Sequence, residues 1–174
     1  MKNKKALSSV IATVLIILLV VASVTIVWSF VKNFIDNRTK STQSCFDVES
    51  SESVTINSYY TCYNSTTGEV QFSINIKDVE IDGLIVSISA EGNSKSFTLN
   101  NTATSFTNLK PYRGNYGDGL KLPGKNEGLT YVASGFGTGS NIDSIKIAPM
   151  IDDEQCSSSD ETFKIDNCVL LVNN

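Results

Sequence analysis

The chain has 174 residues, enough for one domain of ordinary size beside a long apolar segment. Residues 1–40 carry six Lys or Arg and one acidic residue, whereas residues 41–174 carry eight Lys or Arg and seventeen acidic residues. An acidic main part excludes nucleic acid as the expected partner, because phosphate binding needs a basic surface. The sequence contains no His, which removes the commonest general base and the commonest metal ligand.

An apolar segment, Ala6–Val31, lies near the start of the sequence. It holds twenty-six residues without a charge, a Pro or a Gly, and Lys2, Lys4 and Lys5 come directly before it. As a helix it would extend roughly 39 Å, more than the ~30 Å hydrocarbon core of a bilayer. The positive-inside rule places the lysines in the cytoplasm, so we expect the acidic main part outside the cell.

Three interpretations of this segment compete. An ordinary signal peptidase would cut after Val20-Val21-Ala22, but the apolar run continues to Val31, and the cut would leave an apolar N-terminus. The second interpretation is an uncleaved single-pass anchor. The third is removal of a short basic leader ahead of the apolar run. In every case the helix is apolar on all sides, so lipid or other helices must surround it.

The motif Lys5-Ala6-Leu7-Ser8-Ser9-Val10-Ile11-Ala12-Thr13 resembles the class III signal peptide of the archaeal type IV pilin and archaellin superfamily. In that family a prepilin peptidase removes the basic leader, and the apolar stretch stays on the mature protein. The resemblance implies a leader of residues 1–6, with Lys5 and Ala6 before the cut and Leu7 as the new N-terminus. A cut between Lys5 and Ala6 is the neighbouring alternative.

Two features that bacterial pilins carry are missing here. Bacterial pilins have a Glu at the fifth mature position, which in this chain is Ile11, or Val10 under the alternative cut. They often have a helix-kinking Pro, whereas the first Pro here is Pro111. Both differences favour the archaeal branch, in which an uncharged and unbroken helix is common.

The resemblance implies that residues 7–40 form a hydrophobic helix, which anchors the precursor in the membrane and forms the filament core after assembly. The residues expected in that core are Leu7, Val10, Ile11, Val14, Leu15, Leu18, Val21 and Trp28. We expect the helix to fray near Lys40–Gln43 and a Ser/Thr-rich linker, Ser41–Ser44, to lead into a β-rich extracellular domain of residues 41–174.

Alternating apolar residues and turn signals predict strands in residues 41–174, so the expected fold class is α+β with an antiparallel β-sandwich. The strongest strand is Val70–Ile76, in which apolar and polar residues alternate. Short turns predict that it continues into later strands as an antiparallel meander. The other predicted strands are Val54–Tyr59, Leu84–Ile88, Phe97–Leu99, Leu129–Val132, Ile142–Ala148 and a closing run, Cys168–Val172.

Four cysteines, Cys45, Cys62, Cys156 and Cys168, all lie in the predicted β-rich domain. Their separations of 16, 93 and 11 residues do not fit the close pairs of a zinc site, so we expect two disulfides formed in an oxidising compartment. Three pairings exist. We favour Cys45–Cys62 with Cys156–Cys168, and the alternative weighed against it is Cys45–Cys168 with Cys62–Cys156.

Other motifs are weaker signals. Eight of the eleven glycines lie between residues 114 and 139, but without a nucleotide-binding pattern, so they are expected to form loops. Asp152-Asp153-Glu154 lacks the spacing of an EF-hand and is read as a solvated acidic turn. We expect no catalytic, metal or cofactor site and no enzymatic activity. Acceptor triplets for N-glycosylation occur at Asn64, Asn100 and Asn37, of which Asn64, in a predicted turn, is favoured.

The expected function is therefore that of a structural subunit of an archaeal type IV pilus-like filament, used for adhesion or cell contact. Its expected partners are copies of itself, the membrane before assembly, the prepilin peptidase and the pilus assembly platform. One alternative is a monomeric, membrane-anchored surface module, for example one that binds glycans through Tyr112, Tyr116 and Phe136. A further alternative is an archaellin of a motility filament.

Overall fold

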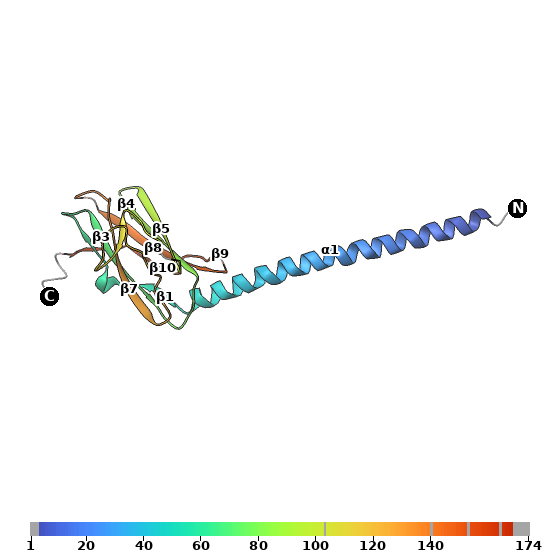
Figure 1. Cartoon of the computed structure of the whole chain (residues 1–174), viewed down its shortest axis with the longest axis horizontal. Helices are drawn as coiled ribbons and strands as arrows, with labels where there is room; N and C mark the ends of the chain where they lie inside the picture. Colours follow the sequence, from blue (N-terminus) through green and yellow to red (C-terminus); the bar gives the residue numbers. More distant parts are fainter. Residues whose placement is uncertain (1–3, 103, 140, 153, 164, 169–174) are drawn as a thin grey trace. The chain divides into compact units, whose positions relative to one another are not determined.

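The computed structural model describes residues 4–102, 104–139, 141–152, 154–163 and 165–168 (Figure 1). The side chains of residues 4–10, 37–38 and 40–42 lie outside this description. The chain divides into two compact units, Met1–Lys40 and Ser41–Asn174. We call the second the β unit. An N-terminal apolar helix followed by a mostly β domain with two sheets confirms the α+β class.

One helix, α1 (Lys4–Ser50), accounts for the whole N-terminal part of the described chain. The predicted fraying near residue 40 is wrong, and Ser41–Ser44 is helical rather than a linker. No Pro or Gly precedes Gly68, and the Gln43 side-chain amide donates to Asp47 Oδ1 at 3.2 Å one turn later. Val48, 2% exposed, belongs to the core of the β unit. The last turns of α1 are therefore part of that unit.

Backbone geometry ends α1 without a glycine. The Ser53 N–H donates to the Val48 carbonyl at 3.3 Å, and the Glu52 N–H donates to the Glu49 carbonyl at 3.4 Å. Glu52 adopts the left-handed conformation, with φ of 47°. These two bonds are those of a Schellman motif, which satisfies carbonyls that the helix end would otherwise leave without a donor.

The β unit contains two sheets. The first has the order β11-β2-β3-β7-β6, with β1 also on β3; the second has the order β10-β8-β4-β5, with β9 also on β8. A 3₁₀ turn, η1 (Ser58–Tyr60), connects β1 to β2. The strands of the first sheet are β1 (Val54–Ile56), β2 (Cys62–Asn64), β3 (Glu69–Ile76), β6 (Leu109–Pro111), β7 (Glu127–Ala133) and β11 (Asp166–Asn167). Those of the second are β4 (Gly83–Ala90), β5 (Asn93–Asn100), β8 (Ile142–Ile151), β9 (Glu154–Gln155) and β10 (Asp160–Thr162).

The predicted meander is only partly correct. β4 and β5 form the expected hairpin, closed by Glu91 and Gly92, which both have positive φ as a tight two-residue turn requires. β3 and β4, however, lie in different sheets. Both strands bury alternate residues in the same core. A connection that crosses from one sheet to the other buries these residues as well as a hairpin within one sheet would, so the alternation does not distinguish the two.

Two other strand predictions also differ from the structure. The strand predicted to continue to Tyr59 ends at Ile56, and β11 pairs with β2 in parallel although an antiparallel fold was predicted. The predicted strand residues Val169–Val172 lie outside the described residues.

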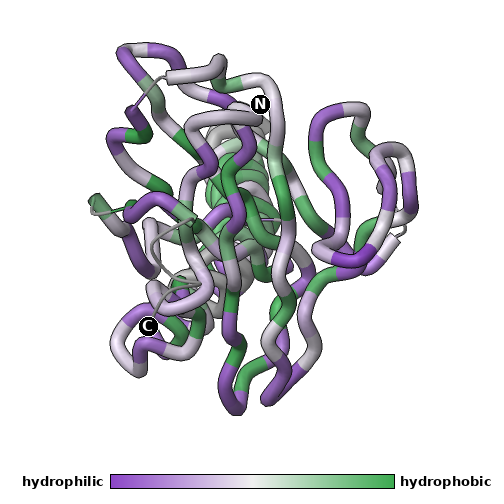
Figure 2. The backbone as a smooth tube through the Cα atoms, turned by 90° about the vertical axis from the view of Figure 1, so that its left-hand side faces the viewer, coloured by the Kyte–Doolittle hydropathy of each residue, from purple (hydrophilic) through white to green (hydrophobic). Residues whose placement is uncertain are grey.

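The core lies between the two sheets. Figure 2 shows hydrophobic and hydrophilic residues alternating along the strands. The buried core includes Phe72 and Ile74 of the first sheet and Val86 and Ile147 of the second. The rings of Phe72 and Tyr131 stack with centroids 5.5 Å apart. Each large apolar side chain buried in this way contributes about 1.5–3 kcal/mol relative to exposure.

All four cysteines form disulfides, but in neither of the two pairings weighed from the sequence. The bonds are Cys45–Cys156 and Cys62–Cys168, with Cα atoms 5.3 and 4.9 Å apart. The parallel pairing of β11 with β2 places Asp166 opposite Cys62 and so brings Cys168 close to it. Cys45 lies on α1 rather than in the predicted β-rich domain. Long-range packing, rather than sequence proximity, therefore selects both partners.

Candidate functional site

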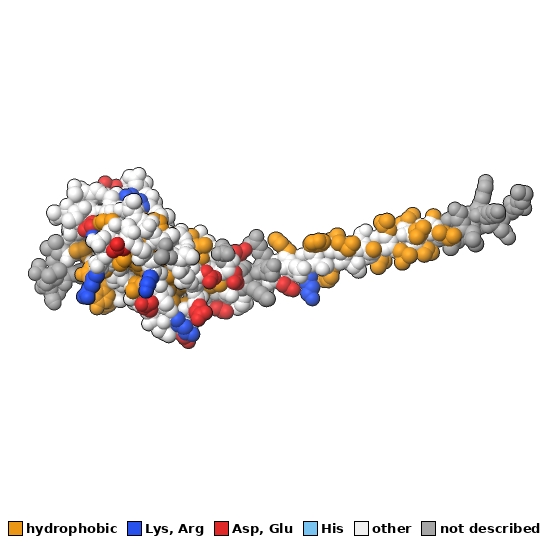
Figure 3. Space-filling view, viewed as in Figure 1, with side chains coloured by type: hydrophobic (Ala, Val, Ile, Leu, Met, Phe, Trp, Pro, Cys, Tyr) orange, Lys and Arg blue, Asp and Glu red, His pale blue; other side chains and the backbone are white. Residues whose placement is uncertain are grey.

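The most extensive candidate site is the surface of α1. Ile11–Asp36, 26 residues, has the length and composition to cross a membrane, and none of it is buried. Figure 3 shows hydrophobic side chains spread along this stretch. Isolated exposed apolar residues are ordinary on protein surfaces, but a continuous apolar surface of this extent marks contact with lipid or with other protein.

The residues predicted to form the filament core are exposed wherever the structure describes their side chains. Their exposed fractions range from 49% for Val14 to 68% for Trp28. These residues are Ile11, Val14, Leu15, Leu18, Val21 and Trp28. The predicted cleavage residues Lys5, Ala6 and Leu7, and the core residue Val10, are helical, but their side chains lie outside the described ones.

Two polar side chains of this stretch bond to the helix backbone. The Ser23 hydroxyl donates to the Leu19 carbonyl, and the Thr25 hydroxyl donates to the Ala22 carbonyl, each at 2.8 Å. A hydroxyl bonded in this way needs no partner outside the helix. The surface can therefore be covered by lipid or by apolar side chains without leaving these hydroxyl donors unsatisfied.

The sequons lie in different environments. Asn64 ends β2, and its side-chain oxygen accepts from the N–H groups of Thr66 and Thr67 at 3.0 and 3.3 Å, which forms the turn expected there. Asn100 ends β5, and its side-chain oxygen accepts from the Thr102 hydroxyl at 2.8 Å. Both residues are half-buried. The side chain of Asn37 lies outside the described ones.

The glycine-rich segment after β6 is held to the first sheet by a polar cluster. The Tyr116 hydroxyl donates to Glu69 Oε1 at 2.6 Å. Lys110 Nζ lies 3.6 Å from the same carboxylate and 4.5 Å from the centroid of the Tyr116 ring. Tyr116, which the glycan-binding hypothesis placed in a binding loop, is thus engaged within the β unit.

The other two aromatic residues of that hypothesis differ in exposure. Phe136 is only 9% exposed, and Lys95 Nζ lies 5.0 Å from the centroid of its ring. Tyr112 is 55% exposed. Sugar rings stack on accessible aromatic faces. Because Phe136 is buried, the three residues do not form an exposed aromatic platform.

The contacts of Glu69 shift the pKa of its carboxyl group. The hydrogen bond from Tyr116 lowers the pKa of Glu69 below its ordinary value; burial opposes this, and the Lys110 charge lowers the pKa further. Burial and the neighbouring Glu69 raise the pKa of Tyr116. Because the carboxyl pKa is lowered in the folded state, this contact stabilises the fold at pH values above the ordinary Glu pKa. That contribution is lost as pH falls through the folded-state pKa.

We predict that Tyr116→Phe raises the pKa of Glu69 towards its ordinary value, because the variant removes the largest contribution that lowers it. Titration of the Glu69 carboxyl by nuclear magnetic resonance in the full chain measures this. The matched control is Tyr112→Phe, which removes the hydroxyl of a more exposed tyrosine that does not contribute to the Glu69 shift, and it should leave the titration unchanged. Equal titration curves for wild type and Tyr116→Phe would contradict the assignment.

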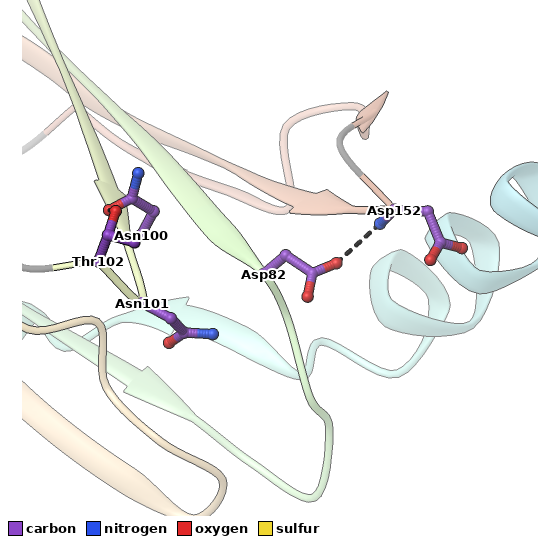
Figure 4. A pocket seen from close by; sticks show the side chains of 5 residues that line it. All are labelled: Asp82, Asn100, Asn101, Thr102 and Asp152. Atoms are coloured by element: carbon purple, nitrogen blue, oxygen red, sulfur yellow. Dashed lines mark hydrogen bonds between the residues drawn. The ribbon is translucent and has the colours of Figure 1, made fainter.

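A pocket of about 420 Å³ lies at the ends of β4, β5 and β8 (Figure 4). Its lining residues are Asp82, Asn100, Asn101, Thr102 and Asp152. Asp82 Oδ2 accepts from the Asp152 backbone N–H at 2.8 Å, so this carboxylate ties two loops together. Within the described part of the chain, no three His, Cys, Asp or Glu residues group as metal ligands. Asp153 of the acidic turn lies outside that part.

Comparisons with protein families, curated proteins and solved structures find no match for this chain. Its function is therefore inferred from the surfaces described above. Of these, the apolar surface of α1 is the most extensive, and the chain itself does not cover it.

Proposed function

We propose that this chain is a structural subunit of an archaeal type IV pilus-like extracellular filament, used for adhesion or cell contact. In this proposal the chain polymerises through α1. The observation that carries the proposal is the uncharged stretch Ile11–Val31, whose side chains are exposed on all sides of the helix.

Such a helix needs a cover in both of the states that the proposal requires. Lipid covers it before assembly, since its length and composition suit a bilayer. Copies of the same helix cover it in the filament, where close packing and dispersion hold the core together. The internally bonded hydroxyls of Ser23 and Thr25 suit both environments. No charged pair is needed for the exchange of lipid for protein.

The resemblance of Lys5–Ser9 to a class III signal peptide favours assembly over permanent anchoring. A prepilin peptidase would remove residues 1–6 and leave the apolar helix on the mature chain. The assembly platform would then transfer the subunit from the membrane to the filament. The two disulfides fit an oxidising compartment, and the acidic composition of the β unit fits a solvated extracellular domain.

Electron microscopy combined with N-terminal sequencing tests this function. Cells that make the full chain together with its processing and assembly proteins should carry filaments that contain it, and the mature chain should begin at Leu7, or at Ala6 under the alternative cut. A chain that begins at Met1 and stays monomeric in the membrane would refute the proposal. A chain that begins at Ser23 would indicate ordinary secretion and refute it equally.

A further inference from the structure

Within the described part of the chain, the strand β5 has one edge on which no other strand pairs. It lies at the end of the second sheet, pairs with β4 alone, and is eight residues long. The other strands that end a sheet among the described residues are much shorter: β6 and β10 have three residues each, and β11 has two. A long unpaired edge offers backbone donors and acceptors to another strand.

The hairpin determines which backbone groups of β5 are free. Its two-residue turn makes Ala90 and Asn93 the hydrogen-bonded closing pair, and from there bonded and non-bonded pairs alternate along the ladder. Ser87 and Ser96 fall in a non-bonded pair, which fits their hydroxyls lying 2.8 Å apart. The residues whose N–H and C=O groups point away from β4 are therefore Ser94, Ser96, Thr98 and Asn100.

Two common protections of an edge strand, a Pro and a β-bulge, are absent from β5. Its register with β4 is unbroken, and it contains no Pro. Its one charged residue, Lys95, is turned away from the edge: Nζ donates to the Gly135 carbonyl at 2.7 Å and lies over the Phe136 ring. The edge is thus uncharged, although the β unit as a whole is acidic.

We propose that β5 of one copy pairs antiparallel with β5 of a second copy, so that two β units share one continuous sheet. A strand that pairs with its own copy offers equal length and matching donors and acceptors, as a two-fold symmetric interface requires. Two acidic units repel each other least where their surfaces are uncharged. The pairing goes beyond polymerisation through α1, because it joins β units and involves no residue of the helix surface.

A single pair of edges is a weak contact, but filaments present it many times. Copies arrayed along two filaments would bind each other with an effective concentration far above that of free subunits. The inferred partner is therefore another copy of this chain, and the inferred result is lateral attachment between filaments.

Hydrogen exchange in the full chain, solubilised in detergent micelles, tests the pairing. The amides of Ser94, Ser96, Thr98 and Asn100 should exchange about tenfold more slowly at high than at low protein concentration, because pairing protects them. The concentration dependence in the wild-type chain tests the pairing without any variant. Exchange that does not depend on concentration would overturn the proposal.

A matched pair of variants locates the protecting contact. Ser96→Pro removes an edge N–H that β4 does not use, so it should abolish the concentration dependence and leave the hairpin intact. Ser96→Ala keeps the N–H and should retain the dependence. Protection that survives in Ser96→Pro, or disappears in Ser96→Ala, would exclude backbone pairing at this edge.

The helix surface provides a separate control. Leu18→Arg, which places a charge on α1, should leave the protection of β5 unchanged. Ser96→Pro should leave filament formation unchanged, although it weakens attachment between filaments. Loss of β5 protection in Leu18→Arg would show that the protection depends on association through α1 and would overturn the proposal. Absence of wild-type filaments would refute only the proposed function.

Discussion

Replacing Cys45 and Cys156 together by Ser should lower the free energy of unfolding by about 3–4 kcal/mol. With Cys62–Cys168 intact, the bond closes a loop that runs from Cys45 to Cys62, across that disulfide, and from Cys168 back to Cys156, and this cross-link restricts the unfolded chain. Domains of this size have total stabilities of about 5–15 kcal/mol, so the loss is a large part of the whole. The same bond joins the end of α1 to the segment between β9 and β10.

Denaturant unfolding of the full chain in micelles measures this loss, with Ser157→Ala as the control. Ser157 is an exposed neighbour of Cys156, and its substitution should change stability by no more than about 0.5 kcal/mol. Peptide mapping without reduction should recover Cys45 linked to Cys156 and Cys62 linked to Cys168. A peptide that links Cys45 to Cys62 would contradict the structure.

Leu18→Arg should abolish filament formation. Leu18 is 59% exposed and lies within the apolar stretch of α1, so in a filament its side chain would meet neighbouring helices. A buried unpaired charge costs several kcal/mol, and at the centre of a membrane helix an Arg costs about 2.5–3.5 kcal/mol on insertion scales. The repeated interface multiplies that cost, because every subunit carries the substitution.

Filament yield by electron microscopy measures this effect, and membrane insertion has to be measured beside it. Leu18→Met conserves volume and should assemble normally, whereas Gln43→Arg adds the same charge on an exposed residue outside the apolar span and should be tolerated. An inserted but unassembled Leu18→Arg chain is the expected result. Normal filament yield from this variant would show that the surface of α1 does not form the core.

Several elements were predictable because local patterns specify them. The absence of Pro and Gly predicted an unbroken helix, and alternation predicted β3 with its buried Val70, Phe72, Ile74 and Ile76. The short turns predicted between strands include the one that closes the β4–β5 hairpin. An even cysteine count predicted two disulfides, which the structure contains. Each of these signals lies within a few residues of the feature it predicts or requires only a count.

Other features depended on contacts between distant segments. The end of α1 was misplaced because Val48 and Cys45 are held by residues of the β unit, and a Ser/Thr-rich stretch alone does not reveal such contacts. The buried ring of Phe136 had no local signal either, since a Gly-Phe-Gly motif is typical of an exposed loop.

The sequence by itself determined that this protein carries a long uncharged apolar helix and a Cys-containing β domain, because composition and periodicity decide which surfaces avoid water. Only the tertiary structure decided which cysteines pair, into which sheet each strand goes, and that β5 keeps a free edge. Strands with alternating apolar residues can bury those residues equally well in several strand orders. The choice among those orders depends on long-range pairing and on the packing of one shared core, and local sequence patterns carry little information about either.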